Sequence, residues 1–356
     1  MTATQHATQP YADLTPEHAL DILERLGVPV DGRLLQLNSY ENRVFQVGLN
    51  DGDFVVAKFY RPGRWSDAQI LEEHAFALDL AKAEVPAVPP MALAADDFPP
   101  HLAHLDAHVL GSPATLGLVG GHRVAVTPRK GGRGPELEDP EVLRWIGRFL
   151  ARMHQTGDRR RFAHRHVLDV RSHGRAARDS IAHSPWLTPE SATRWLSLAE
   201  QALELCDDAF ARVPHLRMRR IHGDCHPGNI LWTPEGPHFV DLDDACMGPA
   251  VQDMWMLLSG DPRDRQVQLH ALLDGYESVA DFDWHELGLI EALRTLRIIH
   301  HSDWLARRWH DPAFPAAFPW FGEPNYWQGQ CGLLMQQIEA MREAASPTPV
   351  DDEDWD

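Results

Sequence analysis

Apolar residues recur along the first part of the chain with helical spacing and then in short runs. A helix is predicted to begin at Thr15, which suits the N-cap with Pro16 at the first helical position, and to end at Gly27. Short apolar runs then predict strands over residues 34–37, 44–47 and 54–59. The Asn-Asp-Gly-Asp sequence at residues 50–53 predicts the turn between the last two of these strands.

The remaining chain is predicted to contain one more clear strand and a series of helices. A helix is expected over residues 66–84, and a strand over residues 123–128 runs into a Gly-rich connection. Residues 86–121 are rich in Pro, Ala, His and Gly with weak periodicity, and we interpret them as irregular strands and a variable surface insertion. Further helices are predicted over residues 139–154, 189–213, 263–277, 284–309 and 324–344.

The length and composition indicate a soluble chain that is large enough for two lobes. Of the 356 residues, 44% are hydrophobic, and no run approaches the roughly eighteen apolar residues of a membrane helix. Residues 1–11 are polar and lack the pattern of a signal peptide, and the four cysteines show no C-x-x-C spacing. We therefore expect a cytoplasmic protein without a disulfide framework or a zinc module.

The charge balance limits the classes of partner. A formal net charge of −19 argues against nucleic acid and against an anionic membrane surface. It permits a basic peptide or a cationic small molecule as substrate, although surface acid also serves solubility alone. We expect a monomer.

One stretch of the chain carries most of the candidate chemistry. Residues 221–231 read Ile-His-Gly-Asp-Cys-His-Pro-Gly-Asn-Ile-Leu, and residues 239–244 read Phe-Val-Asp-Leu-Asp-Asp. Asp224 is followed after four residues by Asn229, and Asp241 lies at a strand end twelve residues later. Phosphoryl transfer needs a carboxylate for the proton of the attacking hydroxyl, and an amide oxygen and a second carboxylate for Mg²⁺. The H-x-D-x-x-x-x-N form of the loop therefore predicts an Mg-nucleotide phosphotransferase.

The same loop leaves a metal-binding alternative open. His222, Asp224 and His226 alternate, so on a regular strand they would share one face and could bind a transition metal. Gly223 and Pro227 argue against a regular strand there, and the chain has no H-E-x-x-H pattern. A metal-dependent hydrolase is therefore the weaker hypothesis.

Upstream residues supply the other parts of a nucleotide site. Lys58 lies in the apolar run Val-Val-Ala-Lys-Phe, like the lysine of V-A-I-K that contacts nucleotide phosphates in kinases. Glu72 and Glu73 are adjacent on the following helix and point about 100° apart, so one of them is expected to pair with Lys58. Ser39 lies in the glycine-free turn Asn-Ser-Tyr-Glu-Asn-Arg, where it could contact a phosphate; a polar hairpin turn is the alternative.

The His-Gly-Asp form of the loop resembles the aminoglycoside phosphotransferase-like branch of the protein kinase superfamily. The chain is also similar to the bacterial stress response kinase A family, and the likeness spans roughly residues 15–345. Six phrases carry it: Asn38–Val44, Lys58–Pro62, Gln69–His74, Met153–Gly157, Val240–Ala245 and Arg307–Pro319. The resemblance implies an ATP-dependent serine/threonine protein kinase of the stress response. It also implies an α+β, bilobal protein kinase-like fold, with an N-lobe antiparallel sheet plus C-helix and a mostly helical C-lobe.

The resemblance also implies a division of the chain and a role for each motif residue. The expected N-lobe is residues 1–128, the hinge 129–135 and the C-lobe 136–356. Glu73 is preferred to Glu72 as the lysine partner because its distance to Val85-Pro86 resembles that in related phosphotransferases. By the resemblance, Asp224 is the proton acceptor, and Asn229 and Asp241 are the Mg²⁺ ligands; as a ligand, Asp241 also takes part in catalysis. Lys58 with Glu73 positions the ATP phosphates, and Ser39 contacts an ATP phosphate.

Several residues near these motifs have less specific expectations. Asp243 and Asp244 could assist the metal or face a cationic substrate, and Asp253 is expected to hold the catalytic loop through buried hydrogen bonds. Cys225 and Cys246 would place two thiols near the Mg²⁺ site, where oxidation could change activity, although buried and inert thiols are the simpler interpretation.

Three further segments are expected to be structural. Residues 159–165 are interpreted as a solvated basic connector, His154 as a packed side chain, and the aromatic, Pro-rich residues 307–321 as lobe packing rather than a substrate groove. No A-P-E element or activation-loop phosphosite is evident, which argues against regulation by loop phosphorylation.

The expected partners are ATP, Mg²⁺ and a protein that carries the Ser or Thr acceptor. The main alternative is a small-molecule kinase of the aminoglycoside, choline or homoserine type, which would use the same residues. A non-catalytic nucleotide-binding module is disfavoured because every catalytic position is occupied.

Overall fold

A computed structural model describes residues 10–95, 98–323 and 325–345. The chain forms two compact units. Unit 1 consists of the described parts of Met1–Arg165, His222–Ala245 and Met256–Ala280, and unit 2 of those of His166–Ile221, Cys246–Trp255 and Asp281–Asp356. All five residues of the predicted catalytic, metal and lysine-pairing set therefore belong to unit 1. The expected lobe boundaries at residues 128 and 136 remain a prediction.

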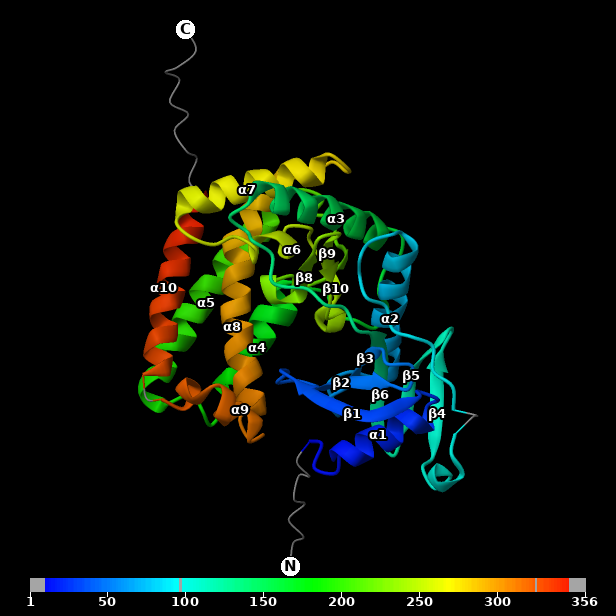
Figure 1. Cartoon of the computed structure of the whole chain (residues 1–356). Helices are drawn as coiled ribbons and strands as arrows, with labels where there is room; N and C mark the ends of the chain where they lie inside the picture. The colour runs from blue at the N-terminus through cyan, green and yellow to red at the C-terminus, as the bar shows by residue number, and fades with distance from the viewer. Residues whose placement is uncertain (1–9, 96–97, 324, 346–356) are drawn as a thin grey trace, which may run out of the picture. The chain divides into compact units, whose positions relative to one another are not determined.

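A six-stranded antiparallel sheet is the centre of unit 1 (Figure 1), which confirms the predicted fold class. Its spatial order is β1-β2-β3-β6-β5-β4. The strands are β1 (Val30–Leu37), β2 (Arg43–Leu49), β3 (Phe54–Phe59), β4 (Ala107–Gly111), β5 (Ala114–Val119) and β6 (His122–Pro128). Unit 1 also contains α1 (Pro16–Arg25), α2 (Asp67–Lys82), α3 (Pro140–Asp158), α7 (Pro262–Glu277) and the hairpin of β8 (Ile230–Thr233) with β9 (Gly236–Phe239).

The segment that we interpreted as irregular strands and a surface insertion contributes two strands to the sheet. Within residues 86–121, β4 and β5 pair with each other, and β5 also pairs with β6. Val119 lies opposite His122, so Gly120 and Gly121 alone connect β5 to β6, both with positive φ (+57° and +90°). A two-residue turn with φ above zero at both positions matches the twist of an antiparallel pair and favours glycine, which explains this sequence.

The two faces of the sheet carry different helices. Val124 and Val126 of β6 pack into the cluster that contains Ile22 of α1, whereas Ala125, between them, packs with Ile70 of α2. Alternation of side chains along a strand produces this division. Lys58 alternates in the same way with buried residues of the α1 cluster, Ala57 and Phe59. It therefore points to the α2 side of the sheet.

Local sequence fixes the starts of both helices. Thr15 Oγ1 accepts a hydrogen bond from His18 N (3.1 Å) at the start of α1. Ser66 and Gln69 form a reciprocal capping box at the start of α2. The capping box places the first turn of α2, and with it Glu72 and Glu73, directly after the loop that follows β3.

Helices α3 and α7 lie side by side (Figure 1), and glycines allow their close approach. A Cβ atom at Gly147 would lie 2.1 Å from Leu272 O, and one at Gly275 would lie 2.1 Å from Arg144 O. Contacts this short cannot be relieved by rotating a side chain, because the atoms in the way are backbone oxygens.

Replacing Gly147 by alanine is expected to lower the free energy of unfolding by about 1–3 kcal/mol, because the added methyl group overpacks the contact of α3 with α7. Gly329→Ala in α10 (Tyr326–Ala345) is the matched control, since a Cβ there meets nothing within 4 Å and the residue is exposed. The control is expected to be neutral or to stabilise by about 0.5–1 kcal/mol. Urea unfolding measures both, and an equal effect of the two changes would contradict the interpretation.

Unit 2 is mainly helical. Helices α5, α8 and α10 pack against one another (Figure 1), with Leu203, Leu296 and Leu334 fully or almost fully buried. The elements are a π-helical turn (Val170–Arg175), α4 (Ala176–Ala182), α5 (Pro189–Ala211), β7 (Arg219–Ile221), β10 (Cys246–Gly248), α6 (Gln252–Trp255), α8 (Ile290–Arg308), α9 (Ala313–Ala317) and α10 (Tyr326–Ala345). In the aromatic segment, Phe314 and Phe321 are buried, as the packing interpretation expects, and Trp320 is half exposed.

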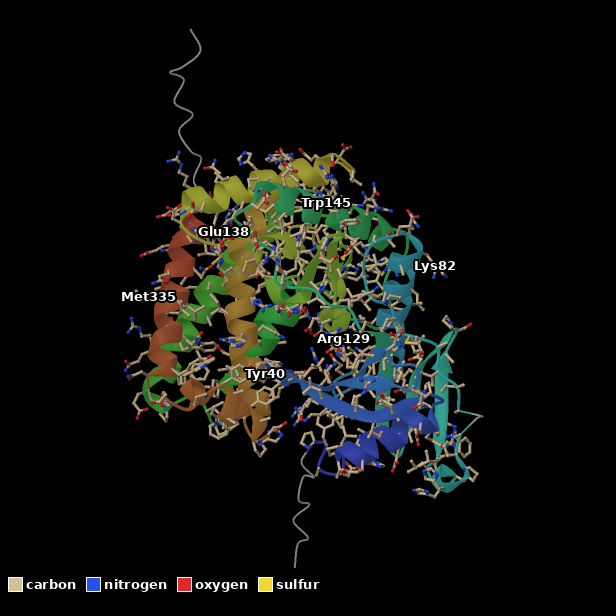
Figure 2. All side chains as sticks on the ribbon, in the orientation of Figure 1. Tyr40, Lys82, Arg129, Glu138, Trp145 and Met335 are labelled. Carbon is tan, nitrogen blue, oxygen red and sulfur yellow. The ribbon has the colours of Figure 1, made fainter. Side chains whose placement is uncertain are left out.

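Side chains along both units are drawn in Figure 2. Tyr40, at the turn between β1 and β2, and Met335, on α10, are 48% and 43% exposed. Among the described residues, no helix combines the length and the apolar composition that crossing a membrane requires.

Candidate active site

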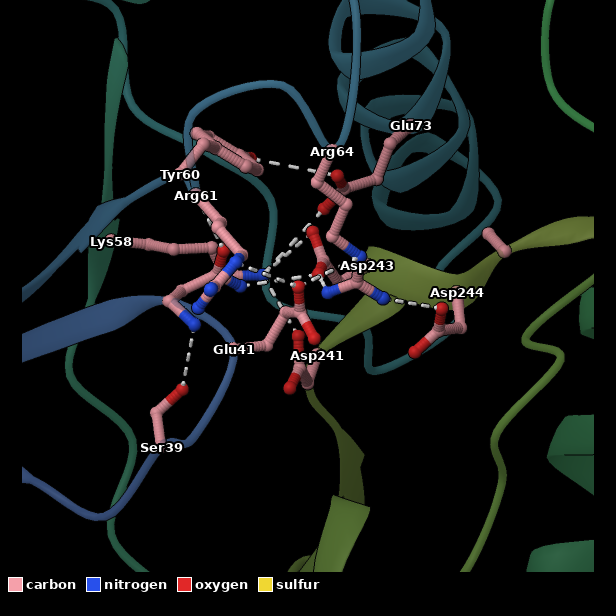
Figure 3. A network of polar contacts seen from close by, with 12 residues as sticks. Ser39, Glu41, Lys58, Tyr60, Arg61, Arg64, Glu73, Asp241, Asp243 and Asp244 are labelled. Atoms are coloured by element: carbon pink, nitrogen blue, oxygen red, sulfur yellow. Dashed lines mark hydrogen bonds and ion pairs between the residues drawn. The ribbon is translucent and has the colours of Figure 1, made fainter. Parts of the chain in front are cut away.

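Lys58 is the centre of a buried ionic cluster (Figure 3). Its Nζ lies 2.8 Å from Asp241 Oδ1, 3.8 Å from Asp243 Oδ1 and 4.0 Å from Glu73 Oε1. Burial works to lower the pKa of Lys58, but the carboxylates of Asp241, Asp243 and Glu73 outweigh burial and raise its pKa well above the usual value. The lysine therefore stays an ammonium ion in the interior of unit 1.

The two adjacent glutamates of α2 have different partners. Glu73 is buried and is the one that faces Lys58. Glu72 instead accepts backbone N–H groups from Ala163 (2.6 Å), His164 (2.9 Å) and Arg165 (2.9 Å). The fallback residue is thus occupied in fixing the loop after α3, because a carboxylate that accepts three N–H groups has little capacity left for a lysine.

Two of the carboxylates around Lys58, Glu73 and Asp241, have pKa values shifted in opposite directions. Burial raises the pKa of Glu73 to about 7, against the opposing effect of Lys58. Burial also works to raise the pKa of Asp241, but the Lys58 ammonium, which is closer, outweighs it and holds that pKa below the usual range. Of Glu73 and Asp241, Glu73 is therefore the carboxylate with the higher pKa and the one that binds a proton more readily.

This raised pKa has a consequence for stability. The folded chain holds a proton on Glu73 that the unfolded chain releases near pH 4.5, so the contribution is full below pH 4.5 and is lost as pH rises through about 7. Glu73→Gln is neutral at every pH, and we expect it to flatten the fall in the free energy of unfolding between pH 4.5 and 7. Urea unfolding across this range tests it. Glu204→Gln, at an exposed position of α5, should keep the wild-type slope, and an equally steep slope in Glu73→Gln would contradict the assignment.

The loop from His222 to Asn229 is held by its own hydrogen bonds. Gly223 has φ +84°, a conformation that favours glycine and lets the chain turn directly before Asp224. Asn229 Nδ2 donates to Asp224 O (2.9 Å), and the buried His222 contacts Val240 O through Nε2 (3.0 Å). Together with the bond from Val240 N to Asn229 O (3.0 Å), these contacts join the loop to the segment that leads into Asp241.

Asp241 has a left-handed backbone conformation, with φ +59° and ψ +65°. This region is unfavourable for residues with a side chain, and residues held in it cluster at functional sites. Its side chain is about half exposed (51%), whereas Asp243, two residues later, is buried. The turn therefore directs the Asp241 carboxylate outward beside Lys58.

The turn that contains Ser39 is linked to the acidic segment by its neighbour Asn42. Ser39 Oγ accepts a hydrogen bond from Asn42 N (3.3 Å), and Asn42 Nδ2 donates to Asp243 Oδ2 (3.1 Å). Asn42 Oδ1 accepts from Arg61 N (3.1 Å). Ser39 thus caps the turn from within, and its contact with a phosphate remains a prediction.

Arg64 is a member of the cluster that sequence reasoning missed. It pairs with Asp243 through Nη1 and with Asp244 through Nη2 (2.6 Å), and its Nε lies 3.8 Å from Glu41 Oε1 (Figure 3). Burial would lower the pKa of Arg64, but Asp243 and Asp244 outweigh it and raise that pKa. The two carboxylates that were expected to assist the metal or to face a cationic substrate are therefore bound to this arginine.

Arg165 corrects the interpretation of residues 159–165 as a solvated connector. Its side chain is buried and donates to the backbone oxygens of Asp243, Ala245 and Gln69. The guanidinium also lies 4.3 Å from the ring centroid of Trp65. Because it bonds both the turn after Asp241 and the first turns of α2, Arg165 joins the two segments that carry the acidic partners of Lys58.

His154, Cys225, Cys246 and Asp253, which the sequence also singled out, are all buried. His154 is fully buried and contacts Tyr276 Oη (3.2 Å) through Nδ1, as the packing interpretation expects. Cys225 is fully buried, and Cys246 and Asp253 are buried in unit 2. Burial of both thiols favours the inert interpretation over the redox hypothesis.

Similarity to known proteins identifies the family of this chain. The model of the phosphotransferase enzyme family, APH, matches residues 33–290, which include every predicted site residue. The chain belongs to this family. The phosphotransferase is 40% identical to serine/threonine protein kinase RdoA of Salmonella typhimurium over 333 residues and 41% identical to stress response kinase A of Escherichia coli K12 over 339 residues. Both matches cover 94% of this chain and 95% of the relative.

Solved structures place the phosphotransferase in the same fold. The amicoumacin kinase hAmiN, in a complex with AMP-PNP, Ca²⁺ and Ami, matches with a TM-score of 0.67 at 17% identity, over 94% of this chain and 95% of the other. A microcompartment-associated aminopropanol kinase matches with a TM-score of 0.63 at 16% identity, over 91% and 98%. The fold of this phosphotransferase is therefore shared by kinases of small molecules.

Proposed function

We propose that this phosphotransferase is an ATP-dependent serine/threonine protein kinase of a bacterial stress response. The observation that carries the proposal is the near full-length similarity, at 40–41% identity, to relatives named serine/threonine protein kinase and stress response kinase A. The small-molecule kinases with the same fold are only 16–17% identical, which supports the shared fold and not a shared substrate.

The donor set suits a divalent cation that prefers oxygen. Asn229 uses its amide nitrogen to donate to Asp224 O, so its carbonyl oxygen is the ligand atom that this side chain offers. Asp241 adds a half-exposed carboxylate whose pKa is below the usual range, so it is ionised at neutral pH. Oxygen ligands of this kind fit Mg²⁺, which would supply positive charge to neutralise the phosphates of ATP.

The chain's own residues would act around the reacting atoms in the following way. With Asp241 as a ligand of the cation, the Lys58 ammonium would be available to phosphate oxygens, and Glu73 would hold the lysine in place. Asp224 accepts the proton of the attacking Ser or Thr hydroxyl. The bond from that oxygen to the γ-phosphorus forms as the bond to the β-phosphate oxygen breaks, and ADP leaves.

The decisive experiment is transfer of labelled γ-phosphate from Mg-ATP. Purified wild type and Asp224→Ala would be incubated with a generic basic protein, which the net charge of −19 makes a suitable acceptor. In parallel, nucleotide turnover would be measured with an aminoglycoside, choline, homoserine and an aminopropanol. Acid hydrolysis of labelled protein identifies the phosphorylated amino acid.

We expect phosphoserine or phosphothreonine on protein with the wild type and none with Asp224→Ala. Turnover that depends on one of the small molecules, without label on protein, would replace the proposal by a small-molecule kinase. Bound ATP without any turnover would indicate a non-catalytic module.

A further inference from the structure

Three side chains with metal-ligating atoms meet at the edge of unit 1, apart from the kinase motifs. Asp13 lies in the segment before α1, His18 in the first turn of α1, and His122 at the start of β6. One ligand atom from each residue lies within 4.8 Å of the other two. His122 Nε2 is 3.1 Å from Asp13 Oδ2, and the rings of His18 and His122 are 5.8 Å apart between centroids.

These separations are close to those around one tetrahedral cation. Bonds of 2.0–2.1 Å to nitrogen and oxygen place neighbouring ligand atoms about 3.3 Å apart, so Asp13 and His122 already have the required spacing. His18 must move by about 1.5 Å at most to reach the same spacing, which rotation of a partly exposed side chain can supply.

The surroundings fix one ligand and leave space for another. The His122 side chain is only 8% exposed and is packed edge-on against Phe59, which limits the orientations of its imidazole. A Cβ atom at Gly120, in the turn just before His122, would lie 4.0 Å from His18 Nε2, so the absence of a side chain keeps this side open. A water molecule could complete four ligands there.

We propose that Asp13, His18 and His122 form a binding site for Zn²⁺ or a similar late first-row divalent cation. Two imidazole nitrogens and one carboxylate oxygen suit such ions, whereas Mg²⁺ prefers oxygen ligands alone. On binding, the cation takes the place of the proton between His122 Nε2 and Asp13 Oδ2, and that proton moves to the other ring nitrogen or to solvent. The four cysteines are all buried and offer no competing thiolate on the surface.

The site would fasten the segment before α1 to the sheet next to the nucleotide-binding turn. Tyr11 precedes Asp13 by two residues, is buried, and its hydroxyl lies within hydrogen-bond distance of Phe59 O (3.1 Å) and Glu41 O (3.3 Å). Glu41 belongs to the turn that contains Ser39, and Phe59 follows Lys58. An occupied site would therefore also stabilise the backbone next to Ser39 and Lys58, the two predicted phosphate contacts.

The test is a titration of the full chain with Zn²⁺ in excess Mg²⁺ and ADP, so that the oxygen-donor site does not take up Zn²⁺. Calorimetry, thermal unfolding and the visible absorption of Co²⁺ in place of Zn²⁺ report binding, stability and imidazole coordination. The variants are His18→Ala, Asp13→Asn and their double. The matched control is His108→Ala, which removes a histidine that lies 3.3 Å from an aspartate, Asp106, in an exposed pair.

We expect one Zn²⁺ per wild-type chain and a higher midpoint of thermal unfolding with Zn²⁺. The Co²⁺ absorption spectrum should report coordination of lower symmetry than that of the hydrated ion. Affinity should fall by about tenfold or more in His18→Ala and Asp13→Asn, a loss that even an outer-shell partner of a metal can cause, and should be unchanged in His108→Ala. The proposal is overturned if the wild type binds no Zn²⁺ under these conditions, or if the double variant binds it as tightly as the wild type.

Discussion

Asp224→Asn is expected to lower kcat for phosphoryl transfer by about 10²–10⁴-fold, the range that a positioned general base contributes. The change keeps the shape of the side chain and removes the atom that takes the proton. It should leave the KM for ATP within about threefold, since Asp224 faces the acceptor hydroxyl in the proposed mechanism and not the nucleotide. Steady-state kinetics with the substrate found by the labelling experiment measure both constants.

The matched control for this variant is Asp274→Asn on α7, where the side chain is 62% exposed and its contact with Arg144 is long (3.6 Å). Asp274→Asn should have wild-type kcat and KM. If Asp224→Asn retains more than about a third of the wild-type kcat, the proton is accepted elsewhere. His226 would then be the next residue to test, because its Nε2 lies 3.5 Å from Asp224 Oδ2.

The parts of the site that the sequence made predictable are those carried by short segments. Asp224 and Asn229 lie on one loop and need only its local turns, which Gly223 and Pro227 indicate. Lys58 could be placed because strand alternation directs it opposite Ala57 and Phe59, both of which are buried. In each case a rule of local geometry connects the residue type to its position, so no tertiary information was needed.

The partners of the acidic segment could not be found in that way. Asp243 contacts Arg64 from 179 positions away and Asn42 from 201 positions away. No periodicity relates residues so far apart, and only the fold determines which arginine reaches which carboxylate. Two arginines shortly after the strand of Lys58, together with Asp-Leu-Asp-Asp downstream, were the available signal, and it does not specify the pairing.

Residues 86–121, which were interpreted as irregular strands and a surface insertion, show a different limit of prediction from sequence. The strand β4 is short and at the edge of the sheet, so only one neighbour constrains it and its apolar pattern is weak. The Gly120-Gly121 pair between apolar runs was a hairpin signal that would have identified β5 as the partner of the predicted strand β6. The choice between Glu72 and Glu73 likewise depended on the loop after α3, whose N–H groups bind Glu72.

Arg64→Met is expected to lower the free energy of unfolding by about 3–5 kcal/mol, because it removes the guanidinium paired with the buried Asp243 carboxylate. The nearest remaining cation is the Lys58 ammonium, 3.8 Å from Asp243 Oδ1, which Asp243 shares with Asp241 and Glu73. Asp243 is 2% exposed, and its Oδ1 already lacks a hydrogen-bond partner, so the remaining carboxylate has few groups to turn to. Urea unfolding followed by circular dichroism measures the loss. Arg123→Met is the matched control, since its pair with Asp67 is about a third exposed and should cost at most about 1 kcal/mol.

Adding Asp243→Asn to Arg64→Met distinguishes a lost ion pair from lost packing of the arginine stem. The amide of Asp243→Asn carries no charge, and its oxygen can still accept a hydrogen bond from Asn42 Nδ2. The double variant should therefore be more stable, by about 0.5–3 kcal/mol, than the sum of the two single effects predicts. Additive effects would instead mean that Arg64 stabilises the protein through its contact with the Trp65 ring, 5.1 Å from the guanidinium. In that case the turn after Asp241 would be held by Asn42, which donates to Asp243 Oδ2, and by Arg165, which donates to the backbone oxygens of Asp243 and Ala245.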